Sequence, residues 1–286
     1  MEPKKVVNNK ARVIPGFGLS LGVVLTMLSV LVLIPLMSVL GYAFRMTPQE
    51  FWQLITRPNV IGAFGTSLLC SLIAAAVNSV FGLLLAWVLV RYDFPGKRLM
   101  DGLIELPFAL PTAVAGITLS KMYSTKGVLG AALARLGIRV SYTRLGLVVA
   151  LVFVGIPFVV RAIQPVLEGL DRKYEEAAHM LGAGRARTFF RVVLPELMPA
   201  LWTGFGLALA RGLGEYGSVV YISGNSEKNG TQVVSYVIMQ KLNAGNMDYE
   251  SATAIALVLL AVSFLLLLFV NILQVRAARR TRERGA

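Results

Sequence analysis

Two charged residues, Arg211 and Glu215, stand within an otherwise uncharged stretch at residues 197–223. Charged side chains in such apolar surroundings are costly, so they usually pair with each other or serve a function. A spacing of four residues places both on one face of a helix, where their side chains can meet. Gly212, Gly214 and Gly217 flank the pair and allow close backbone approach or local unwinding. We therefore single out this pair as a candidate site.

A second candidate lies at residues 102–120, where Pro107 and Pro111 interrupt an apolar stretch and Thr112 supplies a hydroxyl group. Proline donates no backbone hydrogen bond, so each one weakens or breaks the helix around it. Broken helices near the middle of a membrane form the substrate sites of many transporters. A simple packing kink explains the same residues, and both interpretations stay open.

Residues that could bind a metal or perform catalysis are scarce. Cys70 is the one cysteine and His179 the one histidine, so neither an internal disulfide nor a multi-histidine metal site can form. The chain lacks the cluster of polar residues that an integral-membrane enzyme would need. It also lacks a GxxxxGKS/T loop, which cradles the phosphates of a nucleotide. We therefore predict no catalytic, cofactor-binding or metal-binding residues, and no enzyme activity.

The composition places the chain among membrane proteins. It has 286 residues, of which 56% are hydrophobic and only 15% are charged, whereas about 25% of the residues of an average soluble domain are charged. A spanning helix needs roughly 20 mostly apolar residues. Uncharged runs of that length occur at residues 17–44, 60–90 and 251–275. Shorter or interrupted runs at residues 102–120, 145–160 and 197–223 bring the prediction to six spans in an all-α bundle.

The distribution of basic residues predicts the orientation of this bundle. The net charge is +13, but the basic residues sit at the ends of apolar runs and no nucleic-acid motif occurs. With six spans, 18 of the 28 Lys and Arg residues fall on the side of the two termini and nine on the opposite side. Cytoplasmic loops carry the excess of Lys and Arg. We therefore expect a basic cytoplasmic tail at residues 1–16, another at 276–286, and no nucleic-acid partner.

The longest segment on the predicted cytoplasmic side, at residues 161–196, is charged and carries both signs. Residues 173–181 are rich in Glu and Ala and begin with acidic residues, as a helix N-terminus prefers. Gly182 and Gly184 follow and predict a helix stop and a turn. A second helical start at residues 188–193 then runs to Pro195. The pattern predicts a short helix, a glycine turn and re-entry into the membrane.

Within this segment, one spaced pattern resembles the EAA signature of binding-protein-dependent ABC importers. The pattern is Glu176-Ala177-Ala178, three residues, Gly182, nine residues and then Val-x-Leu194-Pro195. The resemblance implies that the short helix docks on an ATPase subunit and transmits its motion. It further implies that Glu176 orients the loop and that Gly182 makes the turn between two short helices.

Other stretches resemble the sulfate/thiosulfate permease family, from about residue 15 to residue 274. They include LPFALPTAVAG at residues 106–116, QPVLE at residues 164–168 and RGLGEYG at residues 211–217. The molybdate permease family is a close relative and shares the EAA loop, so a molybdate or tungstate permease stays the alternative. The LPFALPTAVAG and QPVLE stretches favour sulfate.

The resemblance implies a type I importer permease with several partners. These are a dimer of ABC ATPase subunits, a second related permease chain that makes a heterodimer, an extracytoplasmic sulfate-binding protein and the lipid bilayer. Residues 17–275 would form the permease domain. Arg211, Glu215, Pro107, Pro111 and Thr112 would line or gate the path of the oxyanion, although an ion pair that locks the bundle explains Arg211 and Glu215 as well.

Overall fold

The computed structural model describes residues 17–285, except residues 244 and 246. Among these residues every regular element is helical. The elements are α1 Phe17–Leu28, η1 Ser29–Leu33, α2 Ile34–Ala43, α3 Pro48–Ile55, α4 Pro58–Arg91, α5 Lys97–Ala109, α6 Thr112–Tyr123, α7 Val128–Arg135, α8 Arg144–Gly169, α9 Lys173–Met180, α10 Arg185–Thr188, η2 Phe189–Val193, α11 Leu194–Leu213, α12 Gly217–Ser223, α13 Val234–Asn243 and α14 Tyr249–Gly285.

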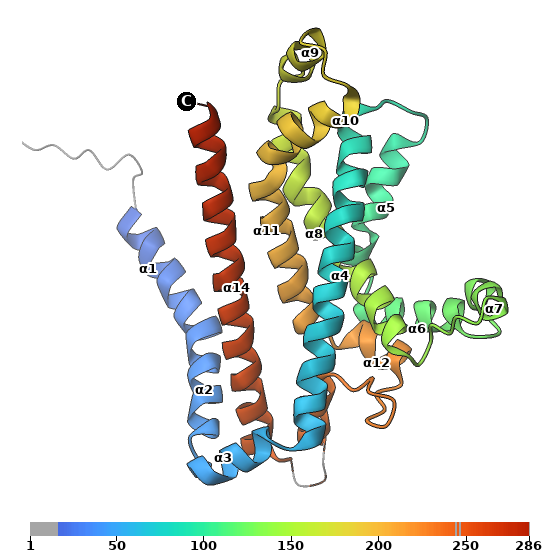
Figure 1. The fold of residues 1–286 in the computed structure, drawn as a ribbon. Helices are drawn as coiled ribbons and strands as arrows, with labels where there is room; N and C mark the ends of the chain where they lie inside the picture. The colour runs from blue at the N-terminus through green and yellow to red at the C-terminus, as the bar shows by residue number, and fades with distance from the viewer. Residues whose placement is uncertain (1–16, 244, 246, 286) are drawn as a thin grey trace, which may run out of the picture.

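The centre of the molecule is a bundle in which α4, α8 and α11 run side by side, with α14 against α11 (Figure 1). Small residues let these helices approach closely, as is usual where helices pack inside a membrane. A Cβ atom on Gly82 of α4 would overlap the side chain of Val159 on α8. Gly204 of α11 meets the backbone of the same Val159. The main apolar core forms around this three-helix contact.

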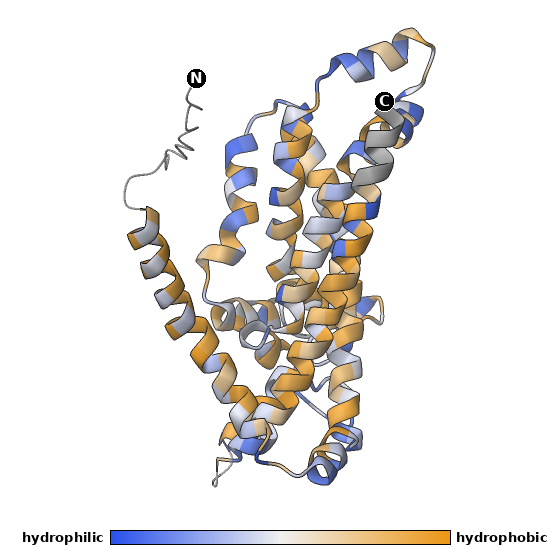
Figure 2. Cartoon of the chain, turned by 90° about the vertical axis from the view of Figure 1, so that its left-hand side faces the viewer, coloured by the Kyte–Doolittle hydropathy of each residue, from blue (hydrophilic) through white to orange (hydrophobic). Residues whose placement is uncertain are grey.

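Five helical stretches are long and apolar enough to cross a membrane within the part of the chain that the structure describes. They are Phe17–Ala43, Pro58–Arg91, Arg144–Gly169, Arg185–Leu213 and Tyr249–Ala277. The first is apolar along its length and none of the residues of α1 is buried, as expected for a lipid-facing helix (Figure 2). The bent pair α5 and α6 makes a sixth crossing if it counts as one span, which agrees with the six predicted spans.

The predicted span at residues 102–120 is in fact two helices bent by 113°. Helix α5 ends at Ala109, Leu110 is extended, and Pro111 precedes the first turn of α6. The residue before a proline avoids the helical region, which explains the break at this position. Pro107, by contrast, is accommodated inside α5. Helices α6 and α7 consequently project sideways from the bundle (Figure 1).

The predicted span at residues 197–223 is wrong in both of its limits. One continuous helical stretch runs from Arg185 through Pro195 to Leu213, and α12 is a separate short helix. Pro195 therefore does not end the helix that enters the bundle. The π-helical turn η2 ends two residues before this proline, and such turns change the hydrogen-bond register where a regular ladder is interrupted.

The positions of the helix ends agree with the prediction that both ends of the bundle and the segment at residues 161–196 lie on one side. The start of α1, the end of α14 and the short helix α9 lie at the same end of the bundle (Figure 1). The predicted tail at residues 1–16 lies outside the described residues. Within the other predicted tail, at residues 276–286, α14 continues as a helix to Gly285.

Candidate functional site

The predicted glycine turn at the end of α9 has the geometry that requires a glycine. Gly182 has a φ of +80°, a left-handed conformation that residues with a side chain rarely adopt. The Gly182 amide donates to the carbonyl of His179 at 2.9 Å, and the Ala183 amide donates to the carbonyl of Ala178 at 3.0 Å. This pair of bonds is a Schellman motif, which satisfies the last carbonyls of a helix. The sequence therefore predicted both the helix and the reason for its end.

Helix α9 protrudes from the end of the bundle and exposes the predicted docking residues (Figure 1). Glu176 and Ala177 are exposed and Ala178 is half-buried. The two apolar residues that follow, Met180 and Leu181, are 90% and 89% exposed. An apolar pair this exposed, next to a small smooth helix face, is typical of a surface that another protein covers.

Leu194 and Pro195, the last members of the spaced pattern, lie apart from this exposed helix. Both are half-buried at the start of α11, where the chain has already joined the bundle. The neighbouring Val193 is completely buried in the main core. The two ends of the pattern therefore differ in role, because one faces outward and the other anchors the segment in the bundle.

Arg211 and Glu215 do form an ion pair, but not across one helix face. Helix α11 ends at Leu213, so Glu215 lies in the break before α12. The Glu215 side chain is 1% exposed and that of Arg211 is 34% exposed. Oε1 of Glu215 accepts hydrogen bonds from the amide and the hydroxyl of Ser218, at 2.8 and 2.9 Å. The carboxylate thus joins the end of α11 to the first turn of α12.

The broken span contributes Thr112 to the same region. Helix α6 packs against α12, and a Cβ atom on Gly217 would overlap the hydroxyl oxygen of Thr112. Gly116 of α6 likewise lies against the backbone of Ser218. Thr112 and the Glu215 break are therefore neighbours, as the prediction of one polar path requires. Pro107 lies elsewhere and is buried within α5.

A second charged cluster, not predicted from the sequence, lies between α5 and α8. Arg161 lies inside α8 rather than in the loop to which the prediction assigned it. One of its nitrogens, Nη1, lies 2.9 Å from Oδ1 of Asp101 and 2.6 Å from Oε1 of Gln164. Its other terminal nitrogen, Nη2, lies 2.6 Å from Oε1 of Glu105. The spacing of the two acidic residues, four apart on one helix, was the signal that could have indicated this cluster.

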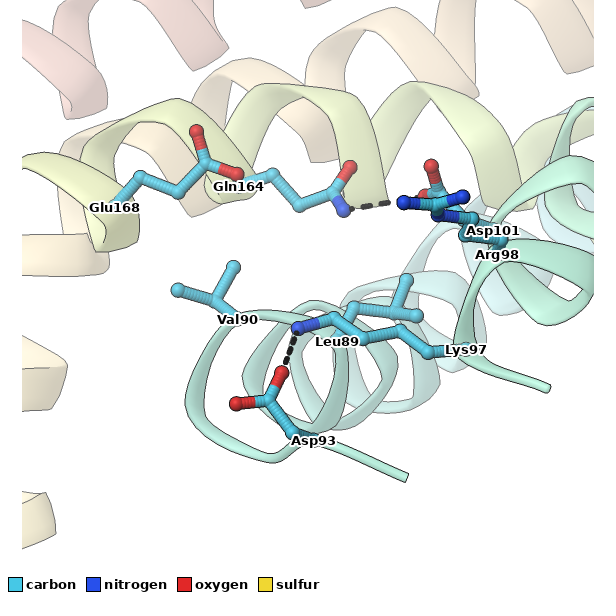
Figure 3. A pocket seen from close by; sticks show the side chains of 8 residues that line it. All are labelled: Leu89, Val90, Asp93, Lys97, Arg98, Asp101, Gln164 and Glu168. Carbon is cyan, nitrogen blue, oxygen red and sulfur yellow. Dashed lines mark hydrogen bonds and ion pairs between the residues drawn. The ribbon is translucent and has the colours of Figure 1, made fainter. Parts of the chain in front are cut away.

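A cavity of about 410 Å³ opens beside this cluster. Gln164 and Glu168 of α8 face the end of α4 and the start of α5 across it, with Lys97 held by Asp93 at 2.9 Å (Figure 3). Side-chain hydrogen bonding and the charge of Lys97 lower the pKa of Asp93. No group of His, Cys, Asp or Glu suited to a metal ion occurs among the described residues.

Comparison with known proteins assigns the chain to a family. Residues 78–283 match the family described as "Binding-protein-dependent transport system inner membrane component". The chain belongs to this family. It is also 49% identical to "Sulfate transport system permease protein CysT" of Escherichia coli (strain K12), over 94% of this chain and 96% of the relative. "Probable sulfate transport system permease protein cysT" of Nephroselmis olivacea is 47% identical, over 87% of this chain and 88% of the relative.

Solved structures share the fold. A bacterial ABC transporter that imports alginate matches with a TM-score of 0.74 and 18% identity, over 91% of this chain and 96% of that chain. The MetNI methionine ABC transporter matches with a TM-score of 0.52 and 16% identity, over 82% and 99% of the two chains. The predictions of an all-α importer permease, of a multi-pass membrane protein and of a transport component rather than an enzyme are therefore confirmed.

Proposed function

We propose that this chain is the permease subunit through which an ATP-driven importer moves sulfate across the membrane. The observation that carries the proposal is 49% identity, over nearly the whole of both chains, to a sulfate transport permease. Identity this high along the full length includes the broken span and the helix break, where a passing solute would meet polar groups. The resemblance to the sulfate/thiosulfate permease family makes thiosulfate, a tetrahedral dianion of similar shape, a further predicted substrate.

A molybdate or tungstate permease is the weaker alternative. Eight relatives that each match over 80–94% of this chain are named as sulfate transport permeases or probable ones. The two substrate assignments also imply different assemblies, because a molybdate permease is expected to form a homodimer and a sulfate permease a heterodimer. Co-purification with a second, different permease chain would separate them.

Helix α9 and its glycine turn are proposed to couple the chain to the ATPase subunits. The exposure of Glu176, Ala177, Met180 and Leu181 supports this role, since the described part of the chain leaves their side chains open to another protein. The chain lacks a phosphate-binding loop of its own, so ATP hydrolysis belongs to a partner subunit. We place α9 and both termini in the cytoplasm because most of the basic residues lie on that side.

A separate solute-binding protein is proposed to deliver the anion on the opposite side. The family is named for dependence on such a protein, and one solved structure with this fold is an alginate transporter in complex with a periplasmic protein. Among the described residues, the two long predicted outer loops, at residues 121–144 and 224–250, contain only the short helices α7 and α13 as complete elements, and each loop is too small to trap a solute.

Arg211, Glu215, Thr112, Pro111 and Pro107 remain our candidates for the translocation path. Arg211 is neutralised by Glu215 and only a third exposed, so it offers limited positive charge. Weak binding suits a permease, because a doubly charged anion held tightly would leave slowly. The ion pair locks the helix break in this conformation, and its opening would free the guanidinium for a passing anion.

The test is labelled sulfate uptake in cells that lack their own sulfate uptake. The chain is expressed with its permease, ATPase and binding-protein partners, as wild type and as Gly182→Asp. Uptake that the substitution abolishes, with the chain still in the membrane, is the expected result. Uptake of molybdate but not sulfate would reassign the substrate, and uptake indifferent to Gly182→Asp would refute the coupling role.

A further inference from the structure

Arg91, the last residue of α4, contacts the proposed coupling segment, which is the stretch at residues 170–193 between α8 and α11. Its Nη2 lies 2.8 Å from Oε1 of Glu175 on α9 and donates to the backbone carbonyl of Leu170 at 3.1 Å. Its side chain is only 9% exposed and that of Glu175 is 21% exposed. The guanidinium also lies over the ring of Trp87, 5.7 Å from its centroid. Arg172 donates to the Arg91 carbonyl at 3.5 Å and adds a contact in the opposite direction.

The end of the proposed coupling segment that leads into α11 contacts α4 one turn before Arg91. The rings of Trp87 and Phe189 pack edge to face, with centroids 5.1 Å apart. Phe189 is the first residue of the π-helical turn that leads into α11. The two contacts leave a cavity of about 610 Å³ between the end of α4, α9 and the helical turns α10 and η2. Helix α4 therefore touches both sides of the protruding loop through two neighbouring side chains.

We propose that Arg91 is a positioning residue that makes α9 move with α4, and that the Arg91–Glu175 pair is the strut between them. The proposal rests on the coupling function proposed above. It adds the contact through which a movement of α9 reaches the bundle. Glu175 precedes the spaced pattern, and Arg91 lies 79 residues before the Leu170 carbonyl that it binds. Neither residue was among those that the sequence singled out.

Because the Arg91–Glu175 pair is largely buried, it is suited to transmitting movement between α9 and α4. A charge pair at the surface is weak because water and long side chains compete with it. Removing one member of a largely buried pair leaves an uncompensated charge and is strongly unfavourable. The guanidinium is further fixed by the Leu170 carbonyl and the Trp87 ring, so it cannot easily rotate away. Helix α4 in turn packs along α8 and α11, so a shift of its end reaches the core of the bundle.

The test uses the assembled transporter in proteoliposomes, with Arg91→Ala, Glu175→Ala, the double variant and Arg91→Lys. Lys173→Ala is the control, because Lys173 is a basic residue of α9, the helix that carries Glu175, and its side chain is 84% exposed. Three quantities are measured for each: ATPase subunit co-purified, ATP hydrolysed and sulfate taken up. We expect near-normal assembly, and a roughly tenfold fall in sulfate moved per ATP for each single alanine variant.

The double variant should be no worse than the worse single variant, since the pair acts as a unit. Arg91→Lys should recover part of the loss because it keeps the charge. Losses that multiply in the double variant, unchanged uptake per ATP in both single variants, or failure of the ATPase to co-purify would each overturn the proposal.

Hydrogen exchange tests the Arg91–Glu175 contact independently of the proposed transport function. In the purified complex, amides of residues 173–180 should exchange faster in Arg91→Ala than in wild type or Lys173→Ala. This readout needs no transport. Faster exchange without any sulfate uptake by the wild type would refute the proposed substrate and leave the strut standing, whereas unchanged exchange would overturn the strut.

Discussion

Nη2 of Arg161 on α8 lies 2.6 Å from Oε1 of Glu105 on α5, although the two residues are 56 positions apart in the sequence. Helix α5 leads into the bend at Pro111, and α8 leads into the coupling segment. The pair therefore connects the first helix of the broken span to the helix before α9. Asp101 and Gln164 bind the same guanidinium and make the connection a network.

Arg161→Ala should lower the thermal stability of the purified chain. The change leaves Asp101 and Glu105 without their counter-charge. Because these side chains are 42% and 56% exposed, solvent screening limits the expected loss to about 1 kcal/mol. A thermal melt in detergent measures it. Lys173→Ala, at an exposed site with only a 3.6 Å contact, is the control, and an equal shift in both variants would contradict the network.

Gly182→Ala should impair sulfate uptake, whereas Gly184→Ala should not. A Cβ atom would meet nothing within 4 Å at either glycine. Only Gly182 has a positive φ, of +80°, while Gly184 is extended. A left-handed conformation costs an ordinary residue roughly 1–2 kcal/mol, so alanine at residue 182 favours a different turn. Uptake and membrane abundance are measured together, and equal uptake in both variants would refute the need for this turn.

Glu215→Ala should be worse for assembly than Glu215→Gln. Glutamine keeps an oxygen that can accept from Ser218 but loses the ion pair with Arg211, whereas alanine loses both. Losing the partner of a buried donor costs about 1–3 kcal/mol. Arg211→Ala and Arg211→Lys are assayed alongside, with transport and complex assembly measured separately. If transport survives Arg211→Ala in an intact complex, Arg211 is not a gate.

Gly116→Ala should destabilise the chain because α6 and α12 are in close contact there. The added methyl group would overlap the backbone of Ser218, which cannot rotate away. Overpacking of this kind typically costs 1–3 kcal/mol. Gly102→Ala is the matched control, since a Cβ atom at that helical glycine meets nothing within 4 Å. The melting temperature in detergent should fall only for Gly116→Ala, and a fall in both would contradict the close contact.

Asp248→Ala should destabilise the start of α14, and Asp248→Asn much less. Oδ1 of Asp248 accepts from the Ser251 amide at 3.0 Å, as an N-cap does, and removing such a cap costs about 1 kcal/mol. Burial raises the pKa of this carboxyl, but hydrogen bonds from Ser251 and Lys241 outweigh burial and leave the pKa below 3.8.

A lowered pKa means that the contribution of Asp248 is complete above pH 3.8 and is lost as the pH falls through the lowered value. The difference in melting temperature between wild type and Asp248→Asn should therefore stay constant from pH 8 to pH 5. A difference that shrinks by pH 5 would show that this carboxylate titrates higher than its hydrogen bonds imply.

The sequence by itself determined the membrane class, the helical bundle, and the short helix with its glycine turn at residues 173–184. These depend on local patterns, because a run of apolar residues and a glycine after a Glu- and Ala-rich segment act within one helix. Gly182 could be assigned its turn from its neighbours alone, and the Schellman bonds from Ala183 to Ala178 span only five residues. The prolines likewise predicted the interruption of the third span.

The tertiary structure alone decided which distant residues meet. Gly214, the C-cap residue of α11, permits a helix end at this position, but a glycine alone does not require one. The helix breaks at that point, and the carboxylate of Glu215, together with packing of α12 against α6, holds the next helix. Arg91 and Glu175, or Arg161 and Glu105, are paired by the packing of separate helices. Periodicity describes one helix at a time, so it cannot show which charged faces two helices turn toward each other.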